Sequence, residues 1–318
     1  MVERKPTRRD VVVRFGKAAL TAGAAGSLLW WLRERPDDHV TLPSVPDWRG
    51  SGDPSAPGVA ARGPDPAANV RRAVAALGGM EMFVRAGETV LIKPNVGWDR
   101  VPEQAADTDP QVVAELVRLC LGAGARRVIV ADRPCNDPRR SFERSGVGPA
   151  AAKAGAQVLH PPGVALERAA LSGSLSGLSV MKAALEADRV INVPVVKQHS
   201  LSRATLGMKN WFGVLGDGRP RLHQGIHRAV AELGAVFRPT LTVIDATRIL
   251  LANGPQGGSL DDVREVGAVA AGTDPVALDA WGAGHLGLEP RRLGFIIEAE
   301  RLGLGLGDPQ RVRELGTA

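Results

Sequence analysis

Lysine, histidine and asparagine gather in three short segments of a chain that uses lysine sparingly. Of the 40 Lys and Arg residues in this 318-residue sequence, seven are lysines, so arginine supplies most of the positive charge. A lysine amine is a compact, titratable charge that holds a carboxylate or phosphate, and a desolvated amine acts as base or nucleophile. The side chains in question are Lys93, Asn95, Lys197, His199, Lys209 and Asn210.

We predict that Lys197, His199 and Lys209 are catalytic, and that Lys93, Asn95 and Asn210 bind substrate. The imidazole of His199 could transfer a proton or bind a metal ion. The alternative is structural: the lysines would extend from strand and helix ends into solvent, and His199 would cap a turn.

Three aspartates are further candidates for substrate binding. Asp245 ends the apolar segment Leu241–Ala246, where a carboxylate binds a ligand or caps the next loop. Asp274 precedes Pro275, so helix capping is its main alternative role. Asp279 follows about one helical turn later, where burial against the site is expected.

Two further histidines have the spacing of a metal pair. His223 and His227 would share one face of a helix, and with His199 they form our candidate metal ligands. The zinc-protease pattern with this spacing has a glutamate next to the first histidine, where this chain has Gln224. Peptide hydrolysis by that mechanism is therefore disfavoured, and a solvated histidine pair is the alternative.

Apolar strands alternate with amphipathic helices through most of the chain. This order predicts an α/β fold with a mainly parallel sheet, helices on both faces and Rossmann-like layers, in one body or two lobes. Ligands of such sheets bind beyond the carboxyl ends of the strands, where the candidate residues would meet. The expected strands are Thr89–Lys93, Arg127–Asp132, Gln157–His160, Arg189–Val193, Leu241–Ala246 and Val266–Ala271. The expected helices begin at Pro66 and Pro110 or span Ser141–Ala154, Met181–Ala187, Leu222–Phe237 and Pro275–His285.

The first 35 residues have the layout of a twin-arginine (Tat) export signal. Arg8 and Arg9 precede an uncharged stretch, Ala18–Leu32, which is shorter than the roughly 20 residues that span a bilayer. We expect a location outside the cytoplasm, with membrane anchoring if the segment is not cleaved. An amphipathic helix docked on the protein body is the alternative. Residues 36–65 are rich in Pro and Gly and predict a linker, which leaves 66–318 as the α/β domain.

Composition narrows the partners and cofactors. The net charge of +6 is scattered and only 4% of residues are aromatic, so we expect no nucleic-acid binding. The two cysteines, Cys120 and Cys135, cannot supply a four-thiolate iron–sulfur cluster within one chain. A disulfide between them is possible but disfavoured. The cofactor is otherwise undetermined, with a metal ion as the candidate.

Several segments jointly resemble the bacterial and archaeal family known as domain of unknown function 362. The segments are Leu91–Asn95, Val190–His199, Thr205–Gly213, Asn253–Pro255 and Gly272–Asp279. The resemblance implies an α/β domain, and it agrees with export because many members carry Tat signals. Some members add a ferredoxin-like module, which this chain lacks. The family implies no established reaction.

We therefore expect an exported enzyme that acts on a small anionic substrate at a Lys/His/Asn/Asp site, with metal assistance as an option. The alternative is a non-catalytic envelope protein that binds an anionic ligand in the same site. The oligomeric state stays open.

Overall fold

The computed structural model describes residues 42–50 and 57–316. The expected export segment lies outside these residues, and so do residues 36–41 and 51–56 of the expected linker. The chain from Pro43 onwards forms one compact unit, so the structure has one body where two lobes were an alternative. Within the described residues, no helix is long and apolar enough to cross a membrane.

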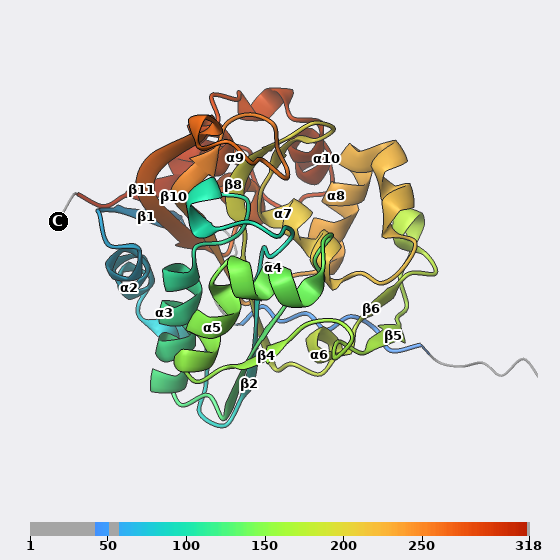
Figure 1. The fold of residues 1–318 in the computed structure, drawn as a ribbon. Helices are drawn as coiled ribbons and strands as arrows, with labels where there is room; N and C mark the ends of the chain where they lie inside the picture. The colour runs from blue at the N-terminus through green and yellow to red at the C-terminus, as the bar shows by residue number, and fades with distance from the viewer. Residues whose placement is uncertain (1–41, 51–56, 317–318) are drawn as a thin grey trace, which may run out of the picture. The chain divides into compact units, whose positions relative to one another are not determined.

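A large sheet runs through the centre of this unit (Figure 1). Its strands lie in the order β12-β1-β11-β10-β7-β2-β3-β4, and β8 and β9 branch from β10. Their bounds are β1 Gly58–Arg62, β2 Thr89–Pro94, β3 Arg127–Ala131, β4 Gln157–Leu159, β7 Arg189–Val193, β8 Val195–His199, β9 Arg203–Thr205, β10 Leu241–Leu250, β11 Val263–Gly272 and β12 Val312–Glu314. A separate ribbon pairs β5 (Leu166–Arg168) with β6 (Ser179–Met181).

The sheet is mainly parallel, as predicted. The strands from β10 through β7, β2 and β3 to β4 are all parallel neighbours. Antiparallel pairing occurs where β11 lies between β1 and β10, and where β9 folds back on β8. The chain is therefore an α/β protein whose parallel strands share one carboxyl edge.

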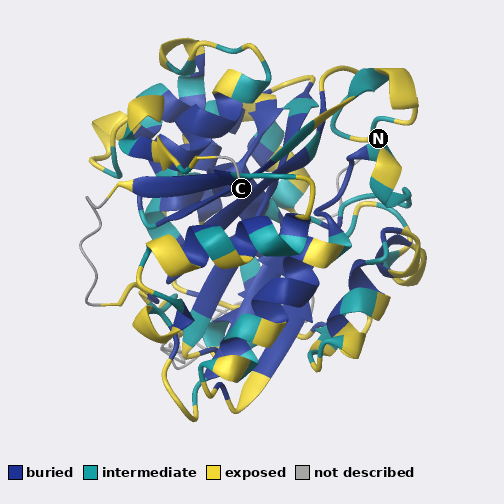
Figure 2. Ribbon diagram, turned by 90° about the vertical axis from the view of Figure 1, so that its left-hand side faces the viewer, coloured by how far each residue is buried: buried dark blue, intermediate teal, exposed yellow. Residues whose placement is uncertain are grey.

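Helices cover both faces of the sheet, and the strands between them are buried (Figure 2). One face packs against α2 (Pro66–Ala76), α3 (Pro110–Gly122) and α5 (Val147–Lys153). The other packs against α8 (Ile226–Val236), α9 (Pro275–His285) and α10 (Gly294–Arg301). The short helix α6 (Lys182–Leu185) contributes Ala184 to a third apolar cluster. Helices on both faces confirm the predicted layers.

Asp-Pro dipeptides start four of the helices, as the sequence indicated for three of them. In each, the aspartate side chain accepts hydrogen bonds from backbone amides of the first turn. The proline that follows has no N–H to leave unpaired and a φ that suits the first helical position. The four capping aspartates are Asp65, Asp109, Asp137 and Asp274.

Three expectations about the elements are wrong in part. Gly58–Arg62, assigned to the linker, is strand β1, whose buried residues pair with β11 and β12. The helix expected over 141–154 is two helices, α4 (Pro138–Arg144) and α5, because Gly146 between them adopts a left-handed φ of 73°. The helix expected from Leu222 begins at Ile226, after a 3₁₀ segment, Arg219–Gly225.

Candidate functional site

Three segments, Lys93–Asn95, Lys197–His199 and Lys209–Asn210, are called the lysine motifs, and they meet beside the carboxyl ends of the parallel strands. Lys93 lies near the end of β2, where its backbone is level with Asn192 on β7. Lys197 lies on β8 opposite Thr205 of β9. After β9 the chain turns directly into the short helix α7, Gly207–Asn210, which carries Lys209. The three motifs are therefore brought together by one sheet edge and one buried turn.

Lys93 is fully buried and forms an ion pair. Its Nζ lies 2.7 Å from Oδ1 of Asp132 and donates to the carbonyl of Pro94 at 2.7 Å and to Oδ1 of Asn210 at 3.1 Å. Burial lowers the pKa of Lys93, and the charge of Asp132 opposes that effect. All three donor positions of the ammonium have acceptors. Lys93 therefore acts as a structural cation that holds Asn210.

Asn210 connects the lysine motifs to one another. Its Oδ1 accepts from Lys93 and from Nδ2 of Asn95 at 2.9 Å. Its Nδ2 donates to Oδ1 of Asn192 at 2.8 Å and to the carbonyl of Lys93 at 3.2 Å. Asn192 in turn donates to the carbonyl of Gly207 at 2.9 Å. This network fixes α7 against β2 and β7.

Lys197 is buried, and within the described residues it makes no hydrogen bond with Asp107, although the charge of that carboxylate acts on it. Its Nζ donates to Oδ1 of Asn95 at 2.7 Å and to the carbonyl of Ala106. Burial lowers the pKa of Lys197 to about 8, and the charge of Asp107 opposes the shift. Burial likewise raises the pKa of Asp107 to about 7, against the charge of Lys197. Oδ1 of Asp107 accepts the amides of Gly97 and Trp98, whereas its buried Oδ2 has no hydrogen-bond partner.

Lys209 differs from the other two lysines. Its side chain is 8% exposed, against 0% for Lys93 and 1% for Lys197. Within the described part of the chain its amine makes no hydrogen bond or ion pair, and its Nζ lies 4.9 Å from the ring centroid of Phe212. Burial, followed by the charge of Lys197, lowers the pKa of Lys209 to about 7. At neutral pH a large share of this amine is therefore uncharged.

His199 is held as a neutral hydrogen-bond donor. Its Nδ1 accepts the backbone amides of Leu201 at 3.1 Å and Ser202 at 3.4 Å, so the ring proton must sit on Nε2. Burial, with Lys209, His223 and Lys197 as further causes, lowers the pKa of His199 to about 3. Histidine ligands of metals normally have their second nitrogen donating instead. The structure therefore favours donation by Nε2–H over metal ligation for His199.

The structure gives the two histidines of the predicted metal pair, His223 and His227, different ring neighbours. His223 belongs to the 3₁₀ segment and stacks on His199, with ring centroids 6.3 Å apart. His227 begins α8 and stacks on Phe295 instead. The helix type changes from 3₁₀ to α between the two histidines. Among the residues that the structure describes, no group of three or more His, Cys, Asp or Glu is placed to hold a metal ion.

The three predicted substrate-binding aspartates bind backbone amides. Asp245 accepts the amides of Asp109 at 2.7 Å and Thr247 at 2.8 Å, and burial raises its pKa to about 6. Asp274 caps α9, which was its alternative role. Asp279 accepts the amides of Gly207 at 2.6 Å and Met208 at 3.1 Å, and burial raises its pKa to about 7. These aspartates position elements, and Asp279 positions the helix that carries Lys209.

Sequence reasoning missed several residues that complete the site. Arg219 donates to the carbonyls of Arg133, Phe212 and Pro134, and its charge reaches Lys93 and Lys209. Cys135 is exposed and close enough to all three lysines that a thiolate there would raise the pKa of each amine. Gly213 is required for packing, since a Cβ there would lie 1.9 Å from Oδ1 of Asp132. Its place in the lysine motif was the only signal for it.

Neither cysteine is bonded. Cys120 is buried and free, and burial raises the pKa of its thiol to about 12. The disulfide that the sequence allowed is therefore not formed.

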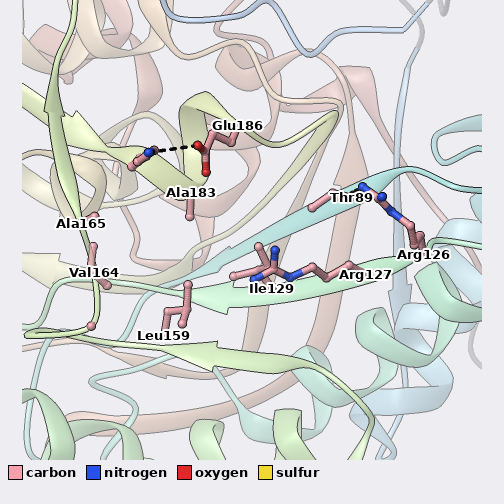
Figure 3. A pocket seen from close by; sticks show the side chains of 11 residues that line it. Thr89, Arg126, Arg127, Ile129, Leu159, Val164, Ala165, Ala183 and Glu186 are labelled. Atoms are coloured by element: carbon pink, nitrogen blue, oxygen red, sulfur yellow. Dashed lines mark hydrogen bonds and ion pairs between the residues drawn. The ribbon is translucent and has the colours of Figure 1, made fainter.

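A separate cavity of about 280 Å³ opens near the starts of β2 and β3, away from the site (Figure 3). It is lined by Arg126, Arg127 and an ion pair between Lys182 and Glu186, over apolar residues that include Ile129. It shares no residue with the lysine motifs.

Comparisons with known proteins agree with the motifs. Residues 90–284 match the family described as a domain of unknown function (DUF362). A thylakoid-associated protein of Synechocystis sp. is 33% identical over 248 residues, which are 74% of this chain and 75% of that relative. A crystal structure of a protein from Thermotoga maritima aligns with a TM-score of 0.38 and 12% identity, over 62% of this chain and 54% of that one, so the chain spans about half of its length. The family match and the identity to this relative show that the chain belongs to the DUF362 family.

Proposed function

We propose that the protein is an enzyme that acts on a small organic anion at the lysine motifs. The amine of Lys209 is its base or nucleophile, and His199 donates a hydrogen bond to the substrate. One observation carries the proposal: the Lys209 amine is buried, has no hydrogen-bonded partner in the described residues and has a pKa lowered to about 7. An amine of this kind accepts protons or attacks carbon at neutral pH.

The same observation favours an enzyme over the alternative, a non-catalytic anion-binding protein. A receptor for anions gains affinity from lysines that stay charged. Burial of Lys209 next to Lys197 costs Lys209 much of its charge at neutral pH. Lys197, with a pKa of about 8, keeps most of its own charge and is the cation that would hold the substrate. A charged amine that binds the anion, Lys197, beside an uncharged amine that reacts with it, Lys209, fits catalysis.

His199 supports this assignment. A neutral imidazole that presents Nε2–H stabilises negative charge on a substrate oxygen without giving up a proton. Its pKa of about 3 keeps it neutral across the physiological range.

Exchange of substrate hydrogens with solvent tests the proposal. Small 2-hydroxy and 2-oxo acids would be incubated with the protein in D₂O, with binding followed by calorimetry and loss of the α-hydrogen signals by NMR. We expect binding and exchange with at least one acid. Lys209→Met should lower the exchange rate about 100-fold or more, a typical contribution of a catalytic base. Lys153→Met changes an exposed lysine of α5 and should leave both unchanged.

Two results would contradict the proposal. Binding without exchange would favour the receptor, and no binding of any acid would remove the lysine motifs as an anion site.

Metal assistance remains a separate option. A metal ion would need ligands beyond His223, because His199 presents a protonated nitrogen. Elemental analysis of wild type beside His223→Ala tests it. A stoichiometric metal that is lost in the variant would place a metal in the mechanism.

We also propose that the chain is exported by the Tat route. The twin arginine of the N-terminal segment supports this, and so does the thylakoid association of the Synechocystis relative. Replacing Arg8 and Arg9 with lysine should keep the protein in the cytoplasmic fraction. Unchanged fractionation of that variant would contradict export by this route.

A further inference from the structure

We infer that Lys209 forms an imine with the carbonyl carbon of a 2-oxo acid, and that such acids are the substrate class of this site. The inference rests on the proposed function, since it specifies what the Lys209 amine reacts with. It adds a covalent intermediate and requires a substrate that carries a carbonyl group next to its carboxylate.

The free amine of Lys209 is the first reason. The amine of Lys93 is bound to a carboxylate, a carbonyl and an amide oxygen, and that of Lys197 to an amide oxygen and a carbonyl. Attack on carbon requires an amine that has lost a proton and is free to turn toward the substrate, whereas acceptors that hold the N–H groups keep an amine protonated and fixed. Of these three amines, Lys209 alone has no such partner in the described residues, and it alone is exposed beyond 1%.

The placement of a second cation is the next reason. The charge of Lys197 reaches Lys209, and Lys197 is itself anchored by Asn95. An amine that is desolvated next to another cation is a known arrangement for imine formation, because the neighbour disfavours protonation of the nucleophile. One donor position of the Lys197 ammonium has no acceptor in the described residues, and it would bind the carboxylate of a 2-oxo acid and bring its adjacent carbonyl to Lys209.

The surrounding rings suit a planar substrate. Phe212 lies against the Lys209 amine, and its ring is 5.3 Å from that of His223, which stacks on His199. A conjugated 2-oxo acid is flat, and flat conjugated groups pack well against aromatic rings. His199 Nε2–H is the donor available to the carbonyl oxygen as negative charge develops on it.

The reaction balances with the groups present. The neutral amine attacks the carbonyl carbon, so a C–N bond forms and the oxygen takes over a proton from the amine to give a carbinolamine. The nitrogen lone pair then forms a C=N bond while the C–O bond breaks, and the hydroxyl takes one proton from solvent and leaves as water. No oxidant or reductant is consumed. The resulting iminium withdraws electrons from the neighbouring carbon and makes its hydrogens acidic.

Rigid support of Lys209 is consistent with covalent chemistry. The amides that begin α7 are held by Asp279, and Asn210, which follows Lys209, is held by Lys93 and Asn192. Fixed geometry of this kind lowers the entropic cost of attack.

Borohydride trapping tests the inference on the full-length protein. Pyruvate is the probe, added with sodium cyanoborohydride, and intact mass and peptide mapping follow the product. We expect one reduced pyruvate per chain, on Lys209, formed faster as the pH rises through about 7, where the amine loses its proton. Lys209→Met should give no adduct, Lys197→Met should slow it at least about tenfold through loss of carboxylate binding, and Lys153→Met should match wild type.

Lactate separates the two levels of the proposal, because it has the carboxylate but no carbonyl. Lactate and pyruvate that bind without any trapped adduct would overturn the imine and leave the proposed base intact. The imine would also be overturned if Lys209→Met formed adducts as fast as wild type, with the adducts spread over exposed lysines. Failure of both acids to bind would remove the proposed function together with the inference. Circular dichroism of each variant confirms that the comparison is between folded proteins.

Discussion

The three buried lysines, Lys93, Lys197 and Lys209, have identical side chains, but the groups around each amine differ. Lys93 is neutralised by Asp132, Lys197 lies near Asp107, and Lys209 has no carboxylate against it in the described residues. Desolvation lowers the pKa of all three, and the nearby carboxylates oppose it for the first two. Reactivity is therefore assigned by neighbours, which sequence spacing does not reveal.

Removing one partner of the Lys93–Asp132 pair should cost much more than removing both. Lys93→Met leaves the carboxylate of Asp132 buried without its cation, which should lower the free energy of unfolding by about 3–5 kcal/mol. Adding Asp132→Asn should recover much of that loss. Urea denaturation of wild type, both single variants and the double variant measures the coupling. Additive losses would show that the pair contributes no coupling energy.

The lysine-rich motifs correctly predicted which side chains lie together, and their roles stay predictions. Lys93, Asn95, Lys197, His199, Lys209 and Asn210 do come together in the structure. Asp245, Asp274 and Asp279 each accept backbone amides, a structural role that the sequence did not distinguish from substrate binding. A buried carboxylate that stabilises a turn and one that binds substrate have the same sequence signal.

At the scale of the element, the short helix α7 depends on a residue far away in the chain. It spans only Gly207–Asn210 and has no side-chain cap from its own N-cap residue. Asp279, on α9, supplies the missing acceptors for its first amides. A Cβ at Gly207 would lie 2.8 Å from Oδ1 of Asp279, so the close approach requires glycine.

Asp279→Ala should therefore disable Lys209 as well as destabilise the protein. Two buried amides lose their acceptor, at about 1–3 kcal/mol for each unsatisfied group. Adduct formation with pyruvate should fall sharply because α7 is no longer fixed. Asp274→Ala is the matched control, since it removes a cap from the start of α9 and should reduce stability without affecting the adduct. An equal loss of adduct in both variants would show that only general stability matters.

The elements with strong local signals were predictable, and those fixed by long-range pairing were not. Asp-Pro starts and apolar runs gave α2, α3, α9 and the central parallel strands close to their observed bounds. Strand β1 was assigned to a linker because it falls within residues 36–65, which are rich in Pro and Gly. It is stabilised by pairing with β11 and β12, which are remote in sequence. The 3₁₀ segment that contains His223 and ends before His227 likewise has no local sequence signature.

At the scale of the whole molecule, the sheet separates two environments. Its carboxyl end carries the charged network of the lysine motifs, whereas the cavity of Figure 3 opens near the starts of the same strands. Burying three amines at one end costs free energy that the remaining packing must offset. The global stability should therefore depend on pH through the amine that has no partner.

For Lys209 the sign of that dependence follows from proton counts. At about pH 6 the folded and unfolded chains both hold the proton, so the full cost of the buried charge is present. Between the folded pKa of about 7 and the ordinary value of 10.5, the unfolded chain binds more protons than the folded one. The free energy of unfolding contributed by this group therefore rises with pH across that window.

Lys209→Met lacks this contribution, so its stability relative to wild type should change with pH. The variant should be more stable than wild type at about pH 6, and that advantage should shrink by about 2 kcal/mol or more by about pH 10. Asp279, whose raised pKa gives a slope of the opposite sign below about 7, is present in both proteins and cancels in the difference. Urea denaturation across this range measures the gap. A gap that stays constant with pH would mean that the Lys209 amine titrates as an ordinary lysine, and the neutral amine on which both proposals depend would be lost with it.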